Sequence, residues 1–344
     1  MIEKSKLNIA CILTTGRTGS DYLQASLDGV PGIIVLPGQT YFKKFFIESN
    51  FENTKYSKIK IINIFIKNYK NLFKNDKLEN KKLNLSTNTF KKIFLKISKN
   101  SNLNKINFIK YIFFSYEILT RNKLNQIKTI VNHCHSVEET RFFLKIFPHA
   151  KVLITIRNPL QNLLSGIKNW KKFSKTYLGQ KHNFFYVKRI LYDLKFAINL
   201  KNKKLFIPLE KSYLKKSHIR LLKFLKVKYT KKIKTATYSG KIWIGDKLSQ
   251  SRTLDGSFNK RVLKTSTENF YHKRDEYILI YFYRIYQIFG YYKKIKFNFN
   301  CKIKYLFFSI LPMKFEKETI YEKPLKMSNY FFYIKRVILF IKHI

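Results

Sequence analysis

Short apolar runs alternate along the chain with stretches in which apolar residues recur every three or four positions. Four runs have the length and composition of buried strands, namely residues 8–14, 128–133, 151–156 and 205–210. Helical spacing follows each of them, over residues 21–29, 137–147, 159–173 and 218–225. This alternation predicts an α/β fold with three layers, α/β/α, around a central parallel sheet. Such sheets bind their ligands at the carboxyl ends of the strands.

Capping signals mark some of the helix boundaries. Asn158 is a suitable N-cap, with Pro159 at the first helical position. Thr265 and Glu268 have the spacing of a capping box, which predicts a helix that runs from there to Gly290.

Two parts of the chain depart from the α/β alternation. Residues 43–127 are rich in Lys, Asn and Phe and mostly have helical apolar spacing, so they predict a helical insert. Residues 296–344 predict a C-terminal helical extension. We therefore expect residues 1–295 to form one α/β domain that carries the insert.

No apolar stretch is long enough to predict a membrane-spanning helix. The N-terminal apolar run has about six residues, too few for a signal peptide, and the later stretches are interrupted by Lys or Arg. We expect a cytoplasmic protein. Residues 329–344 have aromatic and basic residues that would suit peripheral contact with a membrane, although such a helix more often packs on its own domain.

Charge is the most unusual feature of the composition. Lys and Arg number 69 against 20 Asp and Glu, a net charge of +49, while a hydrophobic share of 45% excludes a disordered chain. This charge predicts anionic partners such as phosphates, acidic glycans, membrane surfaces or nucleic acid. Only 11 of the 69 are Arg, the residue preferred for contacts to phosphates and bases, so we expect no dedicated nucleic-acid surface. Biased codon usage, spread over solvated faces, explains the lysines equally well.

The cysteines indicate neither a disulfide framework nor a metal site. Cys11, Cys134 and Cys301 are far apart and odd in number, which fits a reducing compartment. Cys134 stands between two histidines but points to the other side of its strand, so we expect no metal there.

The segment between the first strand and the first helix reads Thr-Thr-Gly-Arg-Thr-Gly-Ser. Gly16 and Gly19 permit a tight turn with exposed amides, and the helix start offers unpaired N–H groups and a positive dipole end. Thr18 and Ser20 add hydroxyl donors, and Arg17 adds a cation. The motif predicts an anion cradle that lacks the GK[ST] of a Walker A loop. The alternative is an ordinary strand–helix turn.

A second motif follows the strand at residues 151–156. Arg157 stands at the strand end, and Ser165 lies about two turns into the next helix, where its hydroxyl can face back toward that end. An Arg and a Ser suit a terminal phosphate, one as a bidentate cation and the other as a neutral donor. The alternative is a helix-capping arginine and a small packing serine.

Together the motifs resemble those of sulfotransferases that use 3′-phosphoadenosine 5′-phosphosulfate (PAPS). TxGRTGSxxLQxxLD after a strand resembles their 5′-phosphosulfate loop, and strand-R-N-P followed by Ser is similar to their 3′-phosphate site. The resemblance covers residues 8–40 and 128–292. It implies a P-loop-like fold of the bacterial type, PAPS as co-substrate, no metal, and sulfuryl transfer to a hydroxyl or amine, for instance of a glycan or lipid-linked sugar. It implies donor-binding roles for Gly16, Arg17, Thr18, Gly19, Ser20, Arg157 and Ser165, with Arg17 at the transferring group.

Three weaker matches contain departures from the family pattern. Glu210 stands at the family's acidic position after a strand, whereas Lys226 replaces the glycine of its FLG[VL] helix end. Residues 239–246 resemble the GKxWxGxS segment, with Asp246 and Lys247 around the usual Ser position.

His133 and His135 are candidates for the general base. Residues i and i+2 of a strand face the same side, and a pKa of about 6.5 suits a base at neutral pH. Cytosolic sulfotransferases carry a catalytic His after the corresponding strand, so the resemblance implies that His135 is the base, with His133 one pleat behind. The alternative is that both only satisfy hydrogen bonds at the strand end. Gln39 stands where glycan-modifying relatives carry a Glu base and cannot act as one, and Glu48 is a remote alternative.

The remaining donor contacts are less specific. Trp243 is the best candidate to stack on adenine, although such a residue more often belongs to a core. Lys241, Arg252 and Arg261 lie in the region from which family members close a basic loop over the 3′-phosphate, and we expect one of them there.

Two other classes of protein stay open. One is a kinase-like nucleotide-binding P-loop protein, against which the missing GK[ST] argues. The other is a basic binder of nucleic acid or membrane surfaces, which the charge supports and the low Arg share weakens. The favoured interpretation expects a nucleotide donor and an acceptor, for instance an anionic glycan or lipid headgroup, as partners and leaves the oligomeric state open.

Overall fold

The computed structural model describes most of the chain. The described residues are 7–52, 57–75, 83–121, 124–173, 177–245, 253–263, 270–292, 298–321 and 326–344. The chain divides into two compact units. The first comprises Met1–Thr14, Gly19–Ile156 and Asn199–Val262, and the second comprises Thr15–Thr18, Arg157–Ile198 and Leu263–Ile344.

A five-stranded parallel sheet forms the centre of the first unit, which confirms the predicted fold class. Its order is β2 (Ile33–Val35), β5 (Thr129–Cys134), β1 (Asn8–Thr14), β6 (Lys151–Ile156) and β7 (Lys204–Pro208). All four predicted strands are present, and β2 is too short to show a pattern in the sequence. Strand β7 ends at Pro208, two residues earlier than predicted, because a 3₁₀ turn over Leu209–Lys211 follows it.

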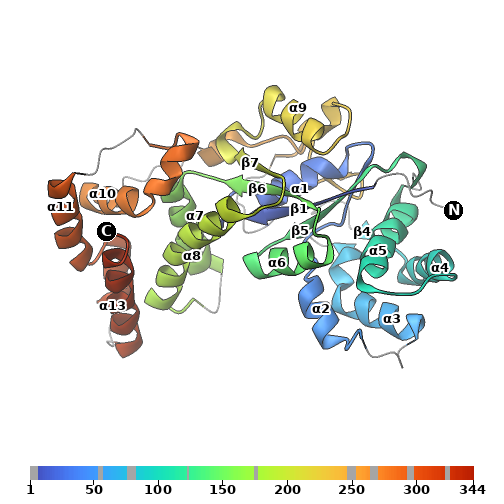
Figure 1. Ribbon diagram of the computed structural model, residues 1–344, viewed down its shortest axis with the longest axis horizontal. Helices are drawn as coiled ribbons and strands as arrows, with labels where there is room; N and C mark the ends of the chain where they lie inside the picture. Colours follow the sequence, from blue (N-terminus) through green and yellow to red (C-terminus); the bar gives the residue numbers. More distant parts are fainter. Residues whose placement is uncertain are drawn as a thin grey trace. The chain divides into compact units, whose positions relative to one another are not determined.

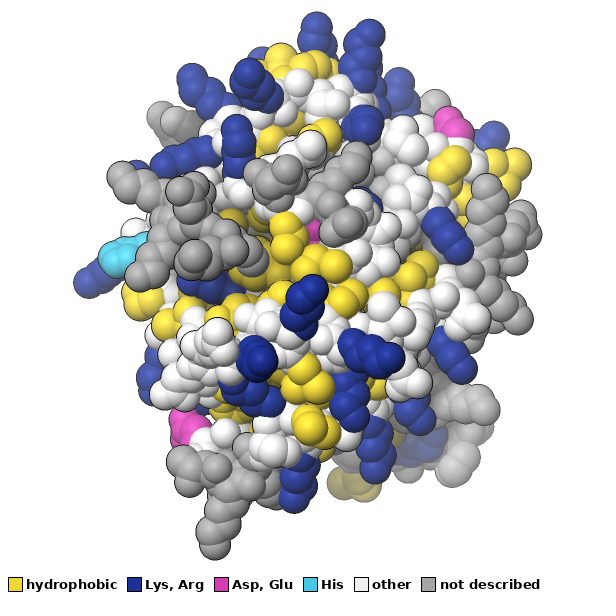
Figure 2. Space-filling model, turned by 90° about the vertical axis from the view of Figure 1, so that its right-hand side faces the viewer, with side chains coloured by type: hydrophobic (Ala, Val, Ile, Leu, Met, Phe, Trp, Pro, Cys, Tyr) yellow, Lys and Arg dark blue, Asp and Glu magenta, His cyan; other side chains and the backbone are white. Residues whose placement is uncertain are grey.

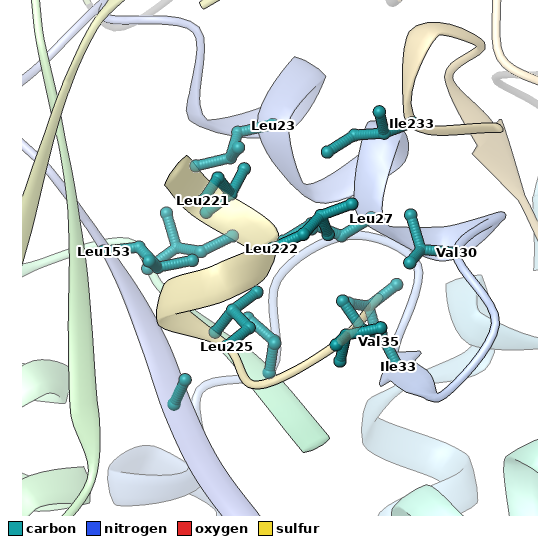
Figure 3. Packing of buried hydrophobic residues seen from close by; sticks show 14 of the residues in the cluster. Leu23, Leu27, Val30, Ile33, Val35, Leu153, Leu221, Leu222, Leu225 and Ile233 are labelled. Carbon is teal, nitrogen blue, oxygen red and sulfur yellow. The ribbon is translucent and has the colours of Figure 1, made fainter. Parts of the chain in front are cut away.

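Helices cover both faces of this sheet. Helices α1 (Ser20–Asp28) and α9 (Lys215–Phe224) pack on one face, where Leu23, Leu27 and Leu222 meet side chains from all five strands (Figure 3). Helix α6 (Val137–Ile146) lies on the opposite face, against β1 and β5 (Figure 1). Burial on both faces explains why the strands are continuous apolar runs rather than alternating ones.

The predicted insert is helical in its described part. It contains α2 (Phe42–Glu48), α3 (Lys58–Asn68), α4 (Thr87–Ser98) and α5 (Lys105–Thr120), together with a hairpin of β3 (Lys74–Asn75) and β4 (Leu83–Asn84). Ser57, Ser86 and Asn104 cap three of the helices with side-chain oxygens. Its core is built from phenylalanines, with the rings of Phe45 and Phe108 stacked at 5.1 Å. These contacts account for much of the aromatic content of the insert.

The described helices of the second unit are α7 (Pro159–Phe173), α8 (Gln180–Asn199), α10 (Lys273–Phe282), α11 (Phe299–Ile310), α12 (Lys314–Ile320) and α13 (Met327–Ile341). Asn158 caps α7 as predicted, since its side chain accepts from the Leu160 amide at 3.0 Å. The predicted helix to Gly290 is present only in part: α10 begins at Lys273 and ends at Phe282, and a 3₁₀ segment leads from there to Gly290, whose φ of 76° closes it. Thr265 and Glu268 lie outside the described residues.

Helix α8 was absent from the predicted elements. Its first turn is held by tertiary contacts, because the Gln180 amide donates to the Asn329 side chain of α13 at 3.2 Å. Glu316 of α12 accepts from the Gln180 side chain and pairs with the buried Arg336 at 2.7 Å. A helix start that depends on residues so distant in sequence leaves no local capping signal. Across the described residues, no helix has the length and apolarity needed to span a membrane.

Candidate active site

The turn after β1, Thr15–Thr18, belongs to the second unit and is braced by two side chains of that same unit. The Arg17 amide donates to Oδ1 of Asn162 in α7 at 2.8 Å and to the hydroxyl of Tyr186 in α8 at 3.0 Å. Asn162 also donates to the Thr15 carbonyl at 2.8 Å, and the Tyr186 hydroxyl donates to Asn162 at 3.1 Å. Neither Asn162 nor Tyr186 was among the predicted site residues, and both fix the backbone that carries Arg17.

Both glycines of the turn are required by their surroundings. Gly16 has a φ of +112°, and a Cβ there would lie 2.8 Å from Asn162 Oδ1. Gly19 has a φ of +79° and precedes α1, and a Cβ there would lie 2.4 Å from Leu209. The predicted tight turn is confirmed.

The expectation of exposed amides in this turn is wrong at two positions. The Arg17 amide is bound to Asn162 and Tyr186, and the Thr18 amide donates to the Gly16 carbonyl at 3.0 Å. An anion at this turn would therefore depend on side chains, namely the guanidinium of Arg17 and the hydroxyls of Thr18 and Ser20, and on the start of α1.

Tyr186 connects the two predicted phosphate motifs. Burial raises the pKa of its hydroxyl, and the positive charges of Arg17, Arg189 and Arg157 counteract that rise. Arg157 is itself buried, directly after β6, and Ser165 is half-buried on α7. The arginines of both motifs thus lie within electrostatic reach of one phenol in the second unit.

Gly166, next to Ser165, allows Tyr186 to take this position. A Cβ on Gly166 would lie 2.0 Å from the ring of Tyr186. A glycine inside a helix generally marks a close approach or a functional constraint. It was therefore the one local signal in the sequence for the contact between α7 and α8.

The two histidines lie side by side in the first unit, as predicted. The ring centroids of His133 and His135 are 5.7 Å apart, and Cys134 between them is buried. β5 ends at Cys134, so His135 is the first residue beyond the strand. Register pairs Leu13 of β1 with Cys134, which places the carboxyl ends of these two strands side by side.

Gln24 of α1 decides which nitrogen of His133 carries the proton. The Gln24 side-chain nitrogen donates to the carbonyls of Leu36 and Gly38, at 2.7 Å for Gly38. Because carbonyls only accept, the amide oxygen is the atom that faces Nδ1 of His133, at 3.1 Å. Nδ1 is therefore the donor, and Nε2 presents a lone pair.

His133 is held neutral in a buried position. Burial lowers its pKa, and the Asp21 carboxylate, 3.7 Å from Nδ1, partly offsets that shift. Nε2 has no hydrogen-bond partner among the described residues. A buried acceptor left unsatisfied costs about 1–3 kcal/mol and calls for a functional or structural explanation.

His135 is more accessible and less constrained. It is half-buried, and its Nδ1 lies 2.8 Å from the side-chain nitrogen of Gln39, whose oxygen accepts from the Tyr41 hydroxyl. The Gln39 nitrogen only donates, so in this arrangement Nδ1 of neutral His135 accepts and its proton lies on Nε2. Rotating the Gln39 amide by 180° would present its oxygen to Nδ1 and its nitrogen to the Tyr41 hydroxyl, which fits the other tautomer. Gln39 is therefore a hydrogen-bond partner of the predicted base.

The remaining predicted residues belong to other elements of the first unit. Trp243 is buried in a core cluster and packs on Tyr238 with ring centroids 5.6 Å apart, so its ring is not available for adenine stacking as it stands. Lys241 begins strand β9 (Lys241–Ile242) and is half-buried, whereas Arg261 is exposed. Glu48 lies on α2 and pairs with Lys44 at 3.6 Å.

Three of the predicted residues fall in gaps between the described ranges. Arg252, Asp246 and Lys247 lie outside the described residues. Glu210 lies in the 3₁₀ turn after β7, and Lys226 has a φ of 60°, a conformation that glycine adopts more readily than lysine. Within the described ranges no three His, Cys, Asp or Glu side chains are grouped to hold a metal.

Comparison with known proteins finds similarity only among solved structures. No protein-family model and no curated protein matches the chain. The sulfotransferase domain from the Synechococcus PCC 7002 olefin synthase is 13% identical, with a TM-score of 0.41 over 77% of this chain and 85% of that chain. The sulfotransferase domain from the curacin biosynthetic pathway is 14% identical, with a TM-score of 0.39 over 87% and 97%. A sulfotransferase from Alicyclobacillus acidocaldarius is 12% identical, with a TM-score of 0.38 over 69% and 85%.

Proposed function

We propose that the chain is a sulfotransferase that uses PAPS and transfers its sulfuryl group to a hydroxyl or amine. The observation that carries the proposal is the position of Arg17 and Arg157. They come from two separate motifs, each following the end of a parallel strand; the Arg17 amide donates to the Tyr186 hydroxyl, and the charge of Arg157 lowers the pKa of the same hydroxyl. Two such cations suit a ligand with an anionic group at each end, as in a doubly phosphorylated adenosine.

The residues of each motif have a distinct role in this proposal. Arg17, Thr18 and Ser20 would hold the 5′-phosphosulfate, on a turn shaped by Gly16 and Gly19, while Arg157 and Ser165 would hold the 3′-phosphate. The brace from Asn162 and Tyr186 supports this role, because it fixes the backbone of Arg17 before any ligand binds.

The transfer itself is a displacement at sulfur. The acceptor oxygen or nitrogen forms a bond to sulfur, the bond from sulfur to the bridging phosphate oxygen breaks, and adenosine 3′,5′-bisphosphate leaves with the electron pair. Arg17 would stabilise the charge that develops on the leaving phosphate. A base takes the proton of the acceptor as the bond forms.

We assign the base to His135 rather than His133. His135 is half-buried, whereas the His133 side chain is fully buried. His133 would keep its neighbour in place. Substituting His135 with Gln should lower turnover about 100-fold or more with little change in donor affinity, whereas equal losses of turnover and donor affinity would contradict the assignment.

The acceptor is proposed only as a chemical class. The lysines of the insert would suit an anionic glycan or lipid headgroup. Figure 2 shows Lys and Arg side chains scattered over the face on which α4 and α5 lie, between apolar and uncharged groups. Scattered charge of this kind favours general attraction of anions over one defined acceptor subsite.

Ligand-induced stabilisation tests the proposed donor. Adenosine 3′,5′-bisphosphate should raise the melting temperature in the absence of metal, and ATP with Mg²⁺ should not match it. Transfer of radiolabelled sulfate from PAPS to a panel of glycans and amines then tests activity. Selective stabilisation by ATP with Mg²⁺ would instead favour a kinase-like protein.

A further inference from the structure

Helix α13 is apolar on two opposite sides. Leu339 and Phe340 are buried, and the nearby Arg336 is buried in its ion pair. The other side bears large apolar residues that are exposed, namely Met327, Phe331, Ile334, Ile338 and Ile341. They recur at intervals of four and three, which places them on one face of the helix, and at 3.6 residues per turn Ile338 points about 200° away from Arg336.

Helix α11 repeats this arrangement. Its buried Tyr305 stacks on Tyr281 of α10 with centroids 4.1 Å apart and donates to the Phe340 carbonyl at 3.1 Å. Its exposed apolar residues are Phe299, Ile303, Leu306, Phe307 and Ile310. We call these ten exposed residues of α11 and α13 the apolar stripes. Contiguous exposed apolar residues of this kind mark interaction surfaces, so the stripes indicate a missing partner.

The charged residues within α11 and α13 are all basic. Neither α11 nor α13 contains an Asp or Glu, whereas Lys302, Lys304 and Lys335 lie within them and Lys342 follows α13. The Lys335 ammonium lies 4.1 Å from the ring centroid of Phe331. This is a cation–π contact, which holds a positive charge directly at the apolar stripe of α13.

We propose that the apolar stripes dock the protein on the surface of an anionic lipid bilayer. Exposed aromatic and aliphatic residues would enter the boundary between headgroups and acyl chains, and the flanking lysines would meet anionic headgroups. A second copy of the chain complements the stripes less well, because a symmetric interface would bring lysines toward lysines. This inference goes beyond the proposed function and does not depend on it.

Co-sedimentation of the full chain with vesicles tests the proposal. Binding should be about tenfold or more tighter to vesicles that contain phosphatidylglycerol than to phosphatidylcholine alone, and should weaken with salt. Equal binding to both vesicles, or no binding, would overturn it.

Matched variants separate the stripes from the general surface. The double variant Ile334→Gln/Ile338→Gln should weaken binding about tenfold or more. The control Ile219→Gln/Ile242→Gln changes residues of similar exposure (43% and 46%, against 54% and 46%) in the first unit and should bind like the parent. Equal loss in both pairs, or no loss in the first, would overturn the assignment to the stripes.

Charge reversal provides a second comparison. Lys335→Glu/Lys342→Glu should weaken binding to anionic vesicles more than Lys216→Glu/Lys223→Glu, which changes the net charge equally. Light scattering without vesicles detects a second copy, and a dimer that the Ile334→Gln/Ile338→Gln variant converts to monomer would overturn the proposal. Melting temperature and adenosine bisphosphate binding should be retained in these variants, so failure of this proposal is distinguishable from failure of the proposed function.

Discussion

At the scale of single residues, hydrogen-bond partners decide what each histidine can do. The Gln24 side-chain nitrogen donates to two backbone carbonyls, so its oxygen accepts from Nδ1 of His133 and the lone pair of the ring is on Nε2. The Gln39 amide lies between His135 and the Tyr41 hydroxyl, which can donate or accept, so rotation of this amide would let His135 change its tautomer. The sequence predicted the pair of histidines, but it gave no sign of these amides, because the contacts join segments about a hundred positions apart.

His133→Asn should flatten the dependence of stability on pH. The folded-state pKa of His133 lies below its unfolded value, so the unfolded chain binds more protons as the pH falls below about 6.5, and that destabilises the fold. The Asn variant keeps a donor toward Gln24 but cannot titrate. Urea unfolding at a series of pH values measures this effect. As the pH falls, the free energy of unfolding should decrease less in the variant than in the wild type, by up to about 1.4 kcal/mol per pH unit. Parallel curves would contradict this account of His133.

Tyr186→Phe should loosen the Arg17 turn without a large loss of stability. The variant removes the hydroxyl that accepts from the Arg17 amide and donates to Asn162. We expect a destabilisation of about 0.5–1.5 kcal/mol, and a loss of donor affinity that exceeds the loss for the exposed Tyr192→Phe. Unchanged calorimetric binding of adenosine bisphosphate would show that the brace has no role in binding.

At the scale of elements, the predictions succeeded where local pattern and tertiary structure agree. The strands β1, β5, β6 and β7 are apolar runs because both faces of the sheet are covered, and Asn158 caps α7 within its own turn. The predictions failed where contacts to residues distant in sequence determine the local structure. Helix α8 begins on contacts to Asn329 and Glu316, and the capacity of Trp243 to stack is removed by the cluster around it.

Gly166→Ala tests the contact between α7 and α8. In a free helix this change would stabilise by about 1 kcal/mol. Here the added methyl would overlap the Tyr186 ring, so we expect a net destabilisation of about 1–3 kcal/mol. Denaturant unfolding measures it, and Tyr186→Ala in the same chain should recover part of the loss. A stabilised Gly166→Ala variant would contradict the packing described for these helices.

At the scale of the whole molecule, the charge of +49 accompanies an ordinary α/β core. The phosphate motifs follow the ends of β1 and β6, as expected for parallel sheets. Charge alone would suit nucleic acid equally well, so specificity has to come from Arg17 and Arg157. The central claim is therefore that these two arginines hold opposite ends of one nucleotide.

Calorimetry with truncated ligands tests this claim most directly. Arg157→Ala should weaken the binding of adenosine 3′,5′-bisphosphate at least about tenfold. It should leave the affinity for adenosine 5′-phosphate unchanged, because that ligand has no 3′-phosphate. Arg17→Ala should weaken the binding of the bisphosphate by a similar factor and leave the affinity for adenosine 3′-phosphate unchanged. The control variant Arg220→Ala, on α9, should bind all three ligands like the wild type. If both arginine variants weaken the binding of the two monophosphates equally, or if neither changes the affinity for the bisphosphate, the two arginines do not bind opposite ends of one nucleotide.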